Sequence, residues 1–118
     1  MKTLLAITLL SGALLALPAH AQNMSFLKNS VVSKFNPDDM KLLQVAAKKA
    51  LADPQDGTAY DWKNEKTSAS GSITSVKSYS KAGATCRDIK FTNHYKANTD
   101  EAVKQFCKNA AGAWKLAS

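Results

Sequence analysis

The sequence is poor in the residue types that most often carry catalysis or bind metals. Its 118 residues include two cysteines and two histidines, and none of them has the C-x₂₋₄-C or H-x₃₋₅-H spacing of a zinc module. Only His94 lies beyond residue 20, and a catalytic base needs a third group to orient it. We interpret His94, in Thr92-Asn93-His94-Tyr95, as a polar residue near the end of a strand. We therefore expect no enzymatic activity, no catalytic residue, no metal and no cofactor.

A long apolar run occurs once, at the start of the chain. Lys2 precedes a mostly apolar stretch from Leu4 to Leu17, and Ala19-His20-Ala21 has the small-x-small pattern of a cleavage site. These features predict a secretory signal peptide at residues 1–21, cleaved before Gln22. The run is too short for a spanning helix, which needs roughly 20 apolar residues. We expect no transmembrane segment after cleavage, no lipid anchor because no cysteine follows the site, and a location in the periplasm or at the cell surface or outer membrane.

Cleavage would leave a small, basic chain. It has 97 residues with 15 basic and 9 acidic side chains, a net charge of +6, and its length fits one domain. Large apolar residues are few, and small exported domains of this kind often add a disulfide. We interpret residues 22–35, which lack strong periodicity, as a weakly ordered N-terminal segment, and residues 36–118 as the domain.

The domain begins with a well-punctuated helix. Asn36 suits the N-cap and Pro37 the first helical position, and the acidic pair at residues 38–39 complements the helix dipole. An apolar stripe follows at helical spacing, and Asp53-Pro54 ends the helix because proline disfavours α geometry in the residue before it. The stripe consists of Met40, Leu43, Ala47, Ala50 and Leu51.

From Ala59 onward, the apolar residues alternate with a period of two, which is typical of strands. Strands are predicted around residues 59–63, 72–79, 84–95 and 114–116, with a loop at 65–71. In a regular strand, Ile73 and Val76 would point to opposite faces, so either a bulge occurs or both faces are partly covered. Residues 100–108 suit either a strand or a helix. The fold class is therefore α+β, with one N-terminal helix packed on a small antiparallel sheet of four to five strands.

The two cysteines are predicted to form a disulfide. Cys86 and Cys107 both remain after signal removal, and exported proteins meet an oxidising compartment. If residue 86 lies opposite 107 in an antiparallel pair, then 91 lies opposite 102 and the turn falls at 96–99. This register puts Cys86 on the face away from Ile89 and Phe91. A redox-active or metal-binding pair would need a C-x-x-C spacing or further ligands, and neither is present.

Six short motifs, taken in order, resemble the C-terminal domain of the bacterial 17 kDa surface-antigen family. The lipid-accepting cysteine and the glycine-rich segment of many members are missing here. The resemblance implies an exported, non-catalytic envelope or surface protein, structural or partner-binding, and it carries over no catalytic residue. The motifs are Asp61-Trp62-Lys63-Asn64, Gly71-Ser72-Ile73-Thr74, Tyr79, Cys86-Arg87, Phe106-Cys107-Lys108 and Gly112-Ala113-Trp114-Lys115-Leu116.

Two other functions compete with this reading. The net charge favours a basic periplasmic protein that binds an anionic envelope polymer, although no aromatic stacking motif for specific nucleic-acid binding is present. An exported hydrolase inhibitor would use an acidic loop, for which residues 53–61 are the candidate. Arg87 is the single arginine, and its guanidinium fork could hold a carboxylate or a row of carbonyls where lysine could not. It suits either an anion contact or a structural role, over an aromatic ring or paired with an acid. Gly71 and Gly112 are interpreted as turn residues.

Overall fold

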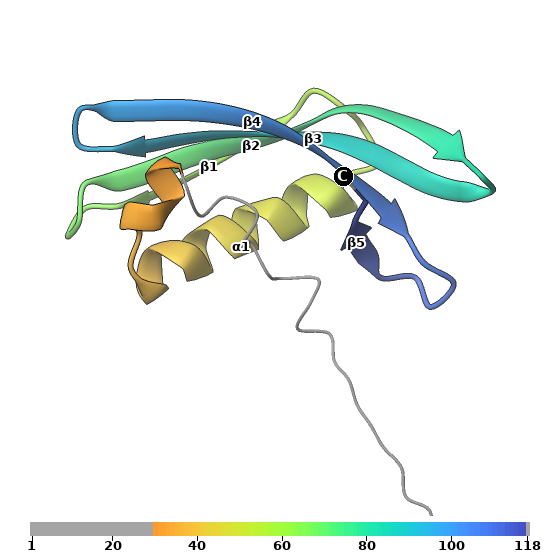
Figure 1. The fold of residues 1–118 in the computed structure, drawn as a ribbon, viewed down its shortest axis with the longest axis horizontal. Helices are drawn as coiled ribbons and strands as arrows, with labels where there is room; N and C mark the ends of the chain where they lie inside the picture. Colours follow the sequence, from red (N-terminus) through yellow and green to blue (C-terminus); the bar gives the residue numbers. More distant parts are fainter. Residues whose placement is uncertain (1–29, 118) are drawn as a thin grey trace, which may run out of the picture.

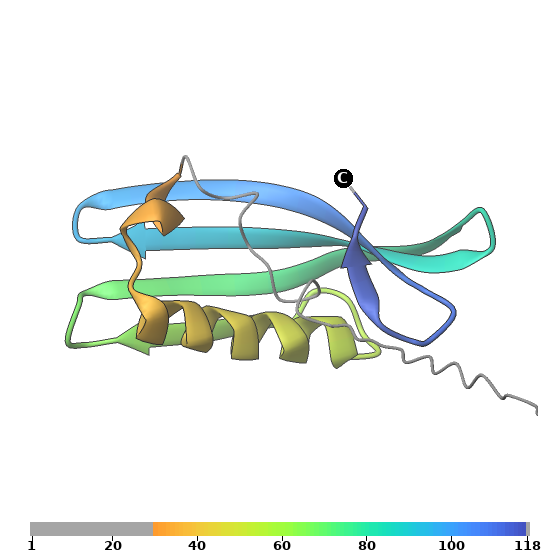
Figure 2. The ribbon, with the colours of Figure 1, turned by 60° about the horizontal axis from the view of Figure 1, so that its bottom comes forward.

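The computed structural model describes residues 30–117 as one helix packed on a five-stranded antiparallel sheet. The strands lie in chain order, so each pairs with its sequence neighbour, and α1 lies along one face (Figures 1 and 2). This confirms the predicted α+β fold, whereas the predicted signal peptide lies outside the described residues. The elements are the 3-10 helix η3 (Val31–Lys34), α1 (Pro37–Ala52), β1 (Ala59–Asn64), β2 (Ala69–Lys81), β3 (Ala84–Tyr95), β4 (Asn98–Lys108) and β5 (Trp114–Leu116).

Helix α1 begins and ends where its capping residues predict. The Asn36 side chain accepts a hydrogen bond from the Asp39 backbone N–H, and the Asp39 carboxylate accepts one from the Asn36 backbone N–H. This reciprocal capping box satisfies two backbone donors at the helix N-terminus, and Asp53 forms the C-cap. Within residues 30–117, no helix is both long enough and apolar enough to cross a membrane.

The core lies between α1 and the sheet. Helix α1 buries a face of small residues and one leucine, and the short alanine side chains allow the helix to approach the sheet closely. The central strands contribute the larger groups, and Phe91 packs near Phe106 with ring centroids 6.3 Å apart. The buried apolar residues at this interface include Leu43, Ala46, Ala47, Ala50, Ile73, Ile89, Phe91 and Phe106.

The end of the segment predicted as weakly ordered is packed against the domain. Residues 30–35 include η3, which Ser30 caps, and Val32 is buried in the core. The Val31 backbone N–H donates to the Asp100 carboxylate at 2.8 Å. Local periodicity did not indicate this element, because a contact across 69 positions of sequence holds it. Residues 22–29 lie outside the described part of the chain.

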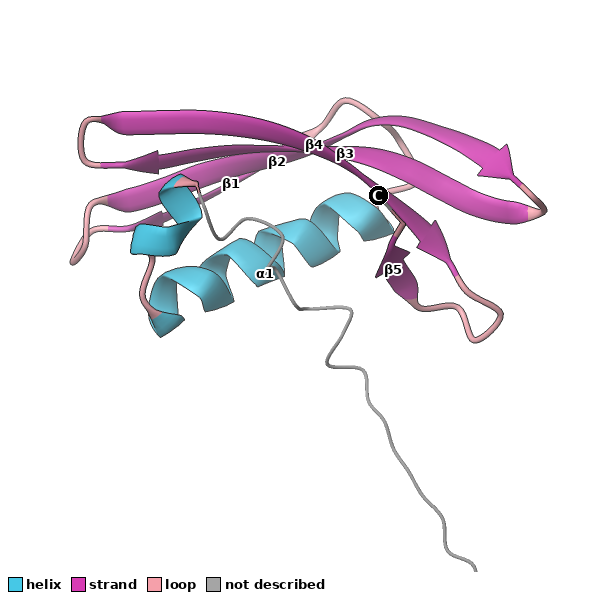
Figure 3. Ribbon diagram, in the orientation of Figure 1, coloured by secondary structure: helices cyan, strands magenta, loops and turns pink. Residues whose placement is uncertain are grey.

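The structure decides between the open alternatives in the strand region. The β2–β3 register shifts between Ser75 and Lys77. This shift is the bulge suggested by the spacing of Ile73 and Val76. Residues 98–108 form β4 and not a helix (Figure 3). Gly112 has a φ of 84° in the turn before β5, as a turn glycine should.

Gly71 is not a turn residue, which corrects the sequence interpretation. It lies within β2 opposite Trp62 of β1. A Cβ atom at position 71 would lie 2.5 Å from the Trp62 Nε1 atom and 2.8 Å from the Thr92 carbonyl oxygen. The glycine is needed because the indole ring covers the backbone at this point, a close approach that only a residue without a side chain permits.

Candidate functional site

The two faces of the sheet have different surroundings. Helix α1 and η3 pack against one face, and no element within residues 30–117 covers the opposite one, which we call the outer face (Figures 1 and 2). Because side chains alternate along a strand, the register identifies the outer-face residues, and they are predominantly hydroxyl-bearing and charged. They include Asp61, Lys63, Ser70, Ser72, Thr74, Lys77, Tyr79, Asp88, Lys90, Thr92, His94, Glu101, Val103 and Gln105.

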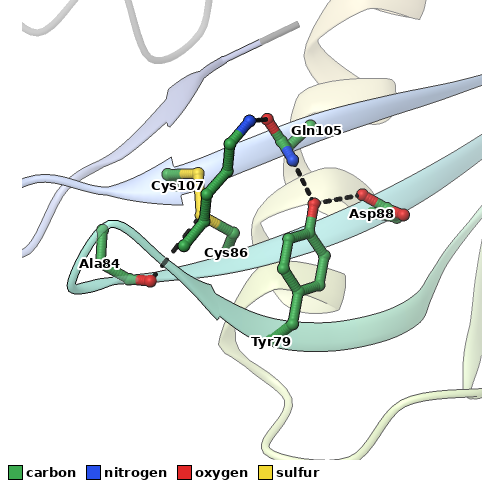
Figure 4. Close-up of a disulfide and its surroundings, with 7 residues drawn as sticks. Tyr79, Ala84, Cys86, Asp88, Gln105 and Cys107 are labelled. Atoms are coloured by element: carbon green, nitrogen blue, oxygen red, sulfur yellow. Dashed lines mark hydrogen bonds between the residues drawn. A yellow bond between two sulfur atoms is a disulfide. The ribbon is translucent and has the colours of Figure 1, made fainter.

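A hydrogen-bonded row of side chains crosses three strands on the outer face. The Tyr79 hydroxyl donates to Asp88 Oδ1 at 2.6 Å, and Gln105 Nε2 donates to the Tyr79 hydroxyl (Figure 4). At the end of the row, Lys81 Nζ donates to Gln105 Oε1 at 3.4 Å. We call Tyr79, Asp88, Gln105 and Lys81 the tyrosine row. Because each member restricts the next, the polar atoms are preorganised.

A disulfide lies directly beside the tyrosine row. Cys86 is bonded to Cys107, with Cα atoms 4.0 Å apart, which confirms the predicted bridge and its register. Cys86 lies opposite Tyr79 in the β2–β3 ladder and is fully buried, although it belongs to the outer face. The bridge therefore joins β3 to β4 where Asp88 and Gln105, two positions further along, support the tyrosine hydroxyl (Figure 4).

The hydrogen bond to Asp88 favours the protonated form of the Tyr79 hydroxyl. The hydrogen bond to Asp88, together with desolvation, raises the pKa of Tyr79 above its ordinary value of 10.0. Lys77 Nζ lies 3.9 Å from Asp88 Oδ2 and 5.4 Å from the centroid of the Tyr79 ring. The phenol therefore lies between a carboxylate and an ammonium group as a hydrogen-bonding group.

The tyrosine row borders an open hollow of about 560 Å³. Two of its lysines, Lys77 and Lys81, are exposed, and its single carboxylate already accepts the tyrosine hydrogen bond. Such a surface can bind the hydroxyl or anionic groups of a partner. The lining residues are Lys77, Tyr79, Ser80, Lys81, Asp88, Val103, Lys104 and Gln105.

Arg87 lies on the opposite, helix-covered face and does not contribute to the hollow. Its Nη1 donates to the carbonyl oxygens of Ala50 and Leu51, each at 3.0 Å, and only 7% of the residue is exposed. Its guanidinium carbon lies 5.8 Å from the centroid of the Trp114 ring. The arginine thus donates to carbonyl oxygens at the C-terminus of α1 and lies near the Trp114 ring. The anion contact of Arg87 stays a prediction.

His94 lies at the other end of the outer face. Its Nδ1 is 2.9 Å from the Thr99 hydroxyl oxygen, and it borders a second open hollow of about 430 Å³ together with Asp61 and Lys63. Within residues 30–117, the observed hydrogen-bond partner of the imidazole is a hydroxyl and not a carboxylate. In this described part of the chain, no group of three His, Cys, Asp or Glu side chains is arranged to hold a metal.

In the acidic loop at residues 53–61, the candidate for an inhibitor, two carboxylates accept hydrogen bonds from side chains of the same domain. Asp53 accepts a hydrogen bond from the Tyr60 hydroxyl at 2.6 Å, and this bond is the main reason that the pKa of Asp53 is lowered. Asp56 accepts hydrogen bonds from Ser75 and Ser78 at 2.7 and 2.8 Å, which lower its pKa in the same way. These contacts anchor the α1–β1 connection to β1 and β2.

The chain is similar to curated proteins described as "17 kDa surface antigen" from Rickettsia bellii and from Rickettsia bellii strain RML369-C. Each is 25% identical over 107 residues, which cover 90% of this chain and 67% of the relative. No family model matches the chain, and no solved structure matches it. The similarity over most of the chain supports a distant, surface-antigen-like relationship.

Proposed function

We propose that this protein is an exported, non-catalytic protein of the cell envelope or surface that binds an envelope partner through its outer face. The observation that carries the proposal is the tyrosine row, a set of polar groups held in place beside a disulfide on an uncovered sheet face. The disulfide supports an oxidising compartment, and the similarity to surface antigens supports the cell surface. The role as a partner-binding module follows from the polar, preorganised character of the face.

Cell fractionation and site-specific crosslinking test this function. We expect the mature protein to begin at Gln22, to carry no free thiol and to fractionate with the envelope. A photo-crosslinking residue at Val103, beside the hollow, should capture an envelope component, whereas the same residue at Lys48, exposed on α1, should not. A cytoplasmic protein, or equal capture from both positions, would contradict the proposal. Turnover of an ester, peptide or glycan that disappears in His94→Ala would contradict the non-catalytic role.

A second candidate function is binding of an anionic envelope polymer through the same hollow, and the exposed lysines Lys77 and Lys81 favour it. Polyanion binding weakens as salt rises, because counterions compete for the cationic groups. We expect Lys77→Gln/Lys81→Gln to elute from a column of immobilised anionic polysaccharide at lower salt than the wild type. The matched control is Lys41→Gln/Lys48→Gln, which removes the same charge from α1. Equal shifts in both variants would leave only a general effect of net charge.

A further inference from the structure

The edge of the sheet at β1 is open for pairing. β1 is the first strand of the sheet and pairs only with β2 among residues 30–117. It is six residues long and regular, and it contains no proline. Edge strands expose a row of unpaired backbone donors and acceptors, and they are a frequent site of pairing with another chain.

The side of α1 next to this edge carries an exposed stripe. Asp38, Leu42, Val45 and Lys49 follow one another at spacings of four, three and four residues, so they share one side of the helix. All four are exposed, Leu42 by 37% and Val45 by 52%. Three of them line a hollow of about 170 Å³ together with β1, which places the stripe beside the open edge.

We propose that a second copy of this chain covers the β1 edge, with the two β1 strands paired antiparallel about a two-fold axis. In an antiparallel pair, residues that lie directly opposite one another point to the same face of the sheet, so the two-fold axis must pass through one residue of β1, which then lies opposite its own copy. An axis through Asp61 or through Lys63 would place like charges together. An axis through Trp62 places Asp61 opposite Lys63 of the partner subunit, twice, and opposite charges in such positions are stabilising.

The helices agree with this arrangement. Since α1 packs against both β1 and β2, its axis lies between them (Figure 2). With paired strands about 4.8 Å apart, the α1 axes of the two subunits would lie about 10 Å apart. That separation is at the upper end of the usual 8–10 Å for packed helices. The two-fold axis makes the helices antiparallel, which directs Asp38 towards Lys49 of the partner subunit and places Leu42 and Val45 between these charged ends.

The charge pattern identifies the occupant as a copy of this chain. Along β1 an acidic residue is followed by a basic one, and along the stripe of α1 an acidic residue is followed by two apolar residues and a basic one. An antiparallel copy of the chain therefore places the acidic end of each pattern against its basic end. An unrelated strand would match it only by carrying the same two patterns in the same geometry. The resulting dimer has one continuous sheet, and both outer faces lie on the same side of it.

The oligomeric state of the mature protein tests the proposal. We expect sedimentation equilibrium of the wild type to show a concentration-dependent monomer–dimer equilibrium. Asp61→Lys should raise the dissociation constant by about tenfold or more, because it places two pairs of positive charges in contact. The double variant Asp61→Lys/Lys63→Asp should restore dimerisation by exchanging the partners.

The matched control is Glu101→Lys, which makes the same change of net charge on β4, away from the β1 edge, and should leave the dissociation constant unchanged. Asp61, Lys63 and Glu101 are all exposed, and circular dichroism of each variant verifies that it folds. A wild type that stays monomeric at all accessible concentrations would overturn the proposal. So would a dimer that is insensitive to Asp61→Lys, or a double variant in which dimerisation is not restored.

Discussion

Replacing Cys86 and Cys107 together with serine is expected to lower the free energy of unfolding by about 3 kcal/mol. The bridge closes a loop between residues 21 positions apart, and in the chain-entropy model this restriction of the unfolded chain is worth about that much. Small domains have a total stability of about 5–15 kcal/mol, so the loss is a large share. Urea denaturation followed by circular dichroism measures it.

The reduced wild-type protein provides the control for this experiment, because it lacks the bridge but keeps both cysteines. It should unfold at nearly the same urea concentration as the double variant. The crosslink from Val103 should also weaken in both forms, since the bridge holds β3 and β4 together beside the tyrosine row. Two free thiols in the exported protein, or a double variant as stable as the oxidised wild type, would contradict the role assigned to the disulfide.

Asp39→Ala is expected to destabilise the protein by about 3 kcal/mol, although it changes only one side chain. Asp39 is fully buried. Its Oδ2 accepts the Asn36 backbone N–H at 2.9 Å, and its Oδ1 accepts hydrogen bonds from Asn64 Nδ2 and the Thr67 hydroxyl, each at 2.8 Å. The substitution leaves the Asn36 backbone N–H and the Asn64 side-chain amide without this acceptor in a partly buried region, and the Thr67 hydroxyl keeps only a longer hydrogen bond to the Asn64 carbonyl oxygen, at 3.4 Å. Unsatisfied or weakly bonded donors of this kind are costly.

Asp38→Ala is the matched control for Asp39→Ala. Asp38 also lies in the first turn of α1 but is exposed, so its removal costs only the interaction with the helix dipole, about 0.3–1 kcal/mol. Chemical denaturation of the two variants under the same conditions separates the dipole effect from the buried hydrogen bonds. Equal destabilisation by the two substitutions would show that Asp39 does not connect α1 to the β1–β2 turn in the way described.

The sequence predicted the elements whose signals are local. Asn36, Pro37 and Asp53 set the bounds of α1 because capping and proline geometry act within a few residues. The alternation around Phe91 predicted its strand, and the parity of Val76 indicated the bulge. The pairing of the cysteines also followed, because the bridge and the turn between β3 and β4 have to agree on one register. The turn was predicted at 96–99, and the structure shortens it to 96–97. The same register places Asp88 opposite Gln105, so this neighbour pair is predictable from the sequence.

The remaining features depend on contacts between residues far apart in the chain. Gly71 appeared to be a turn glycine until the structure placed the Trp62 ring over it, and Arg87 had several possible partners until α1 brought its last carbonyls within reach. The tyrosine row depends on the bulge in β2, which sets the face on which Tyr79 emerges. Local patterns specify helices, strands and faces because these are short-range preferences of the backbone. The packing of whole elements decides which side chains meet. One added residue in a strand moves every following side chain to the opposite face of the sheet.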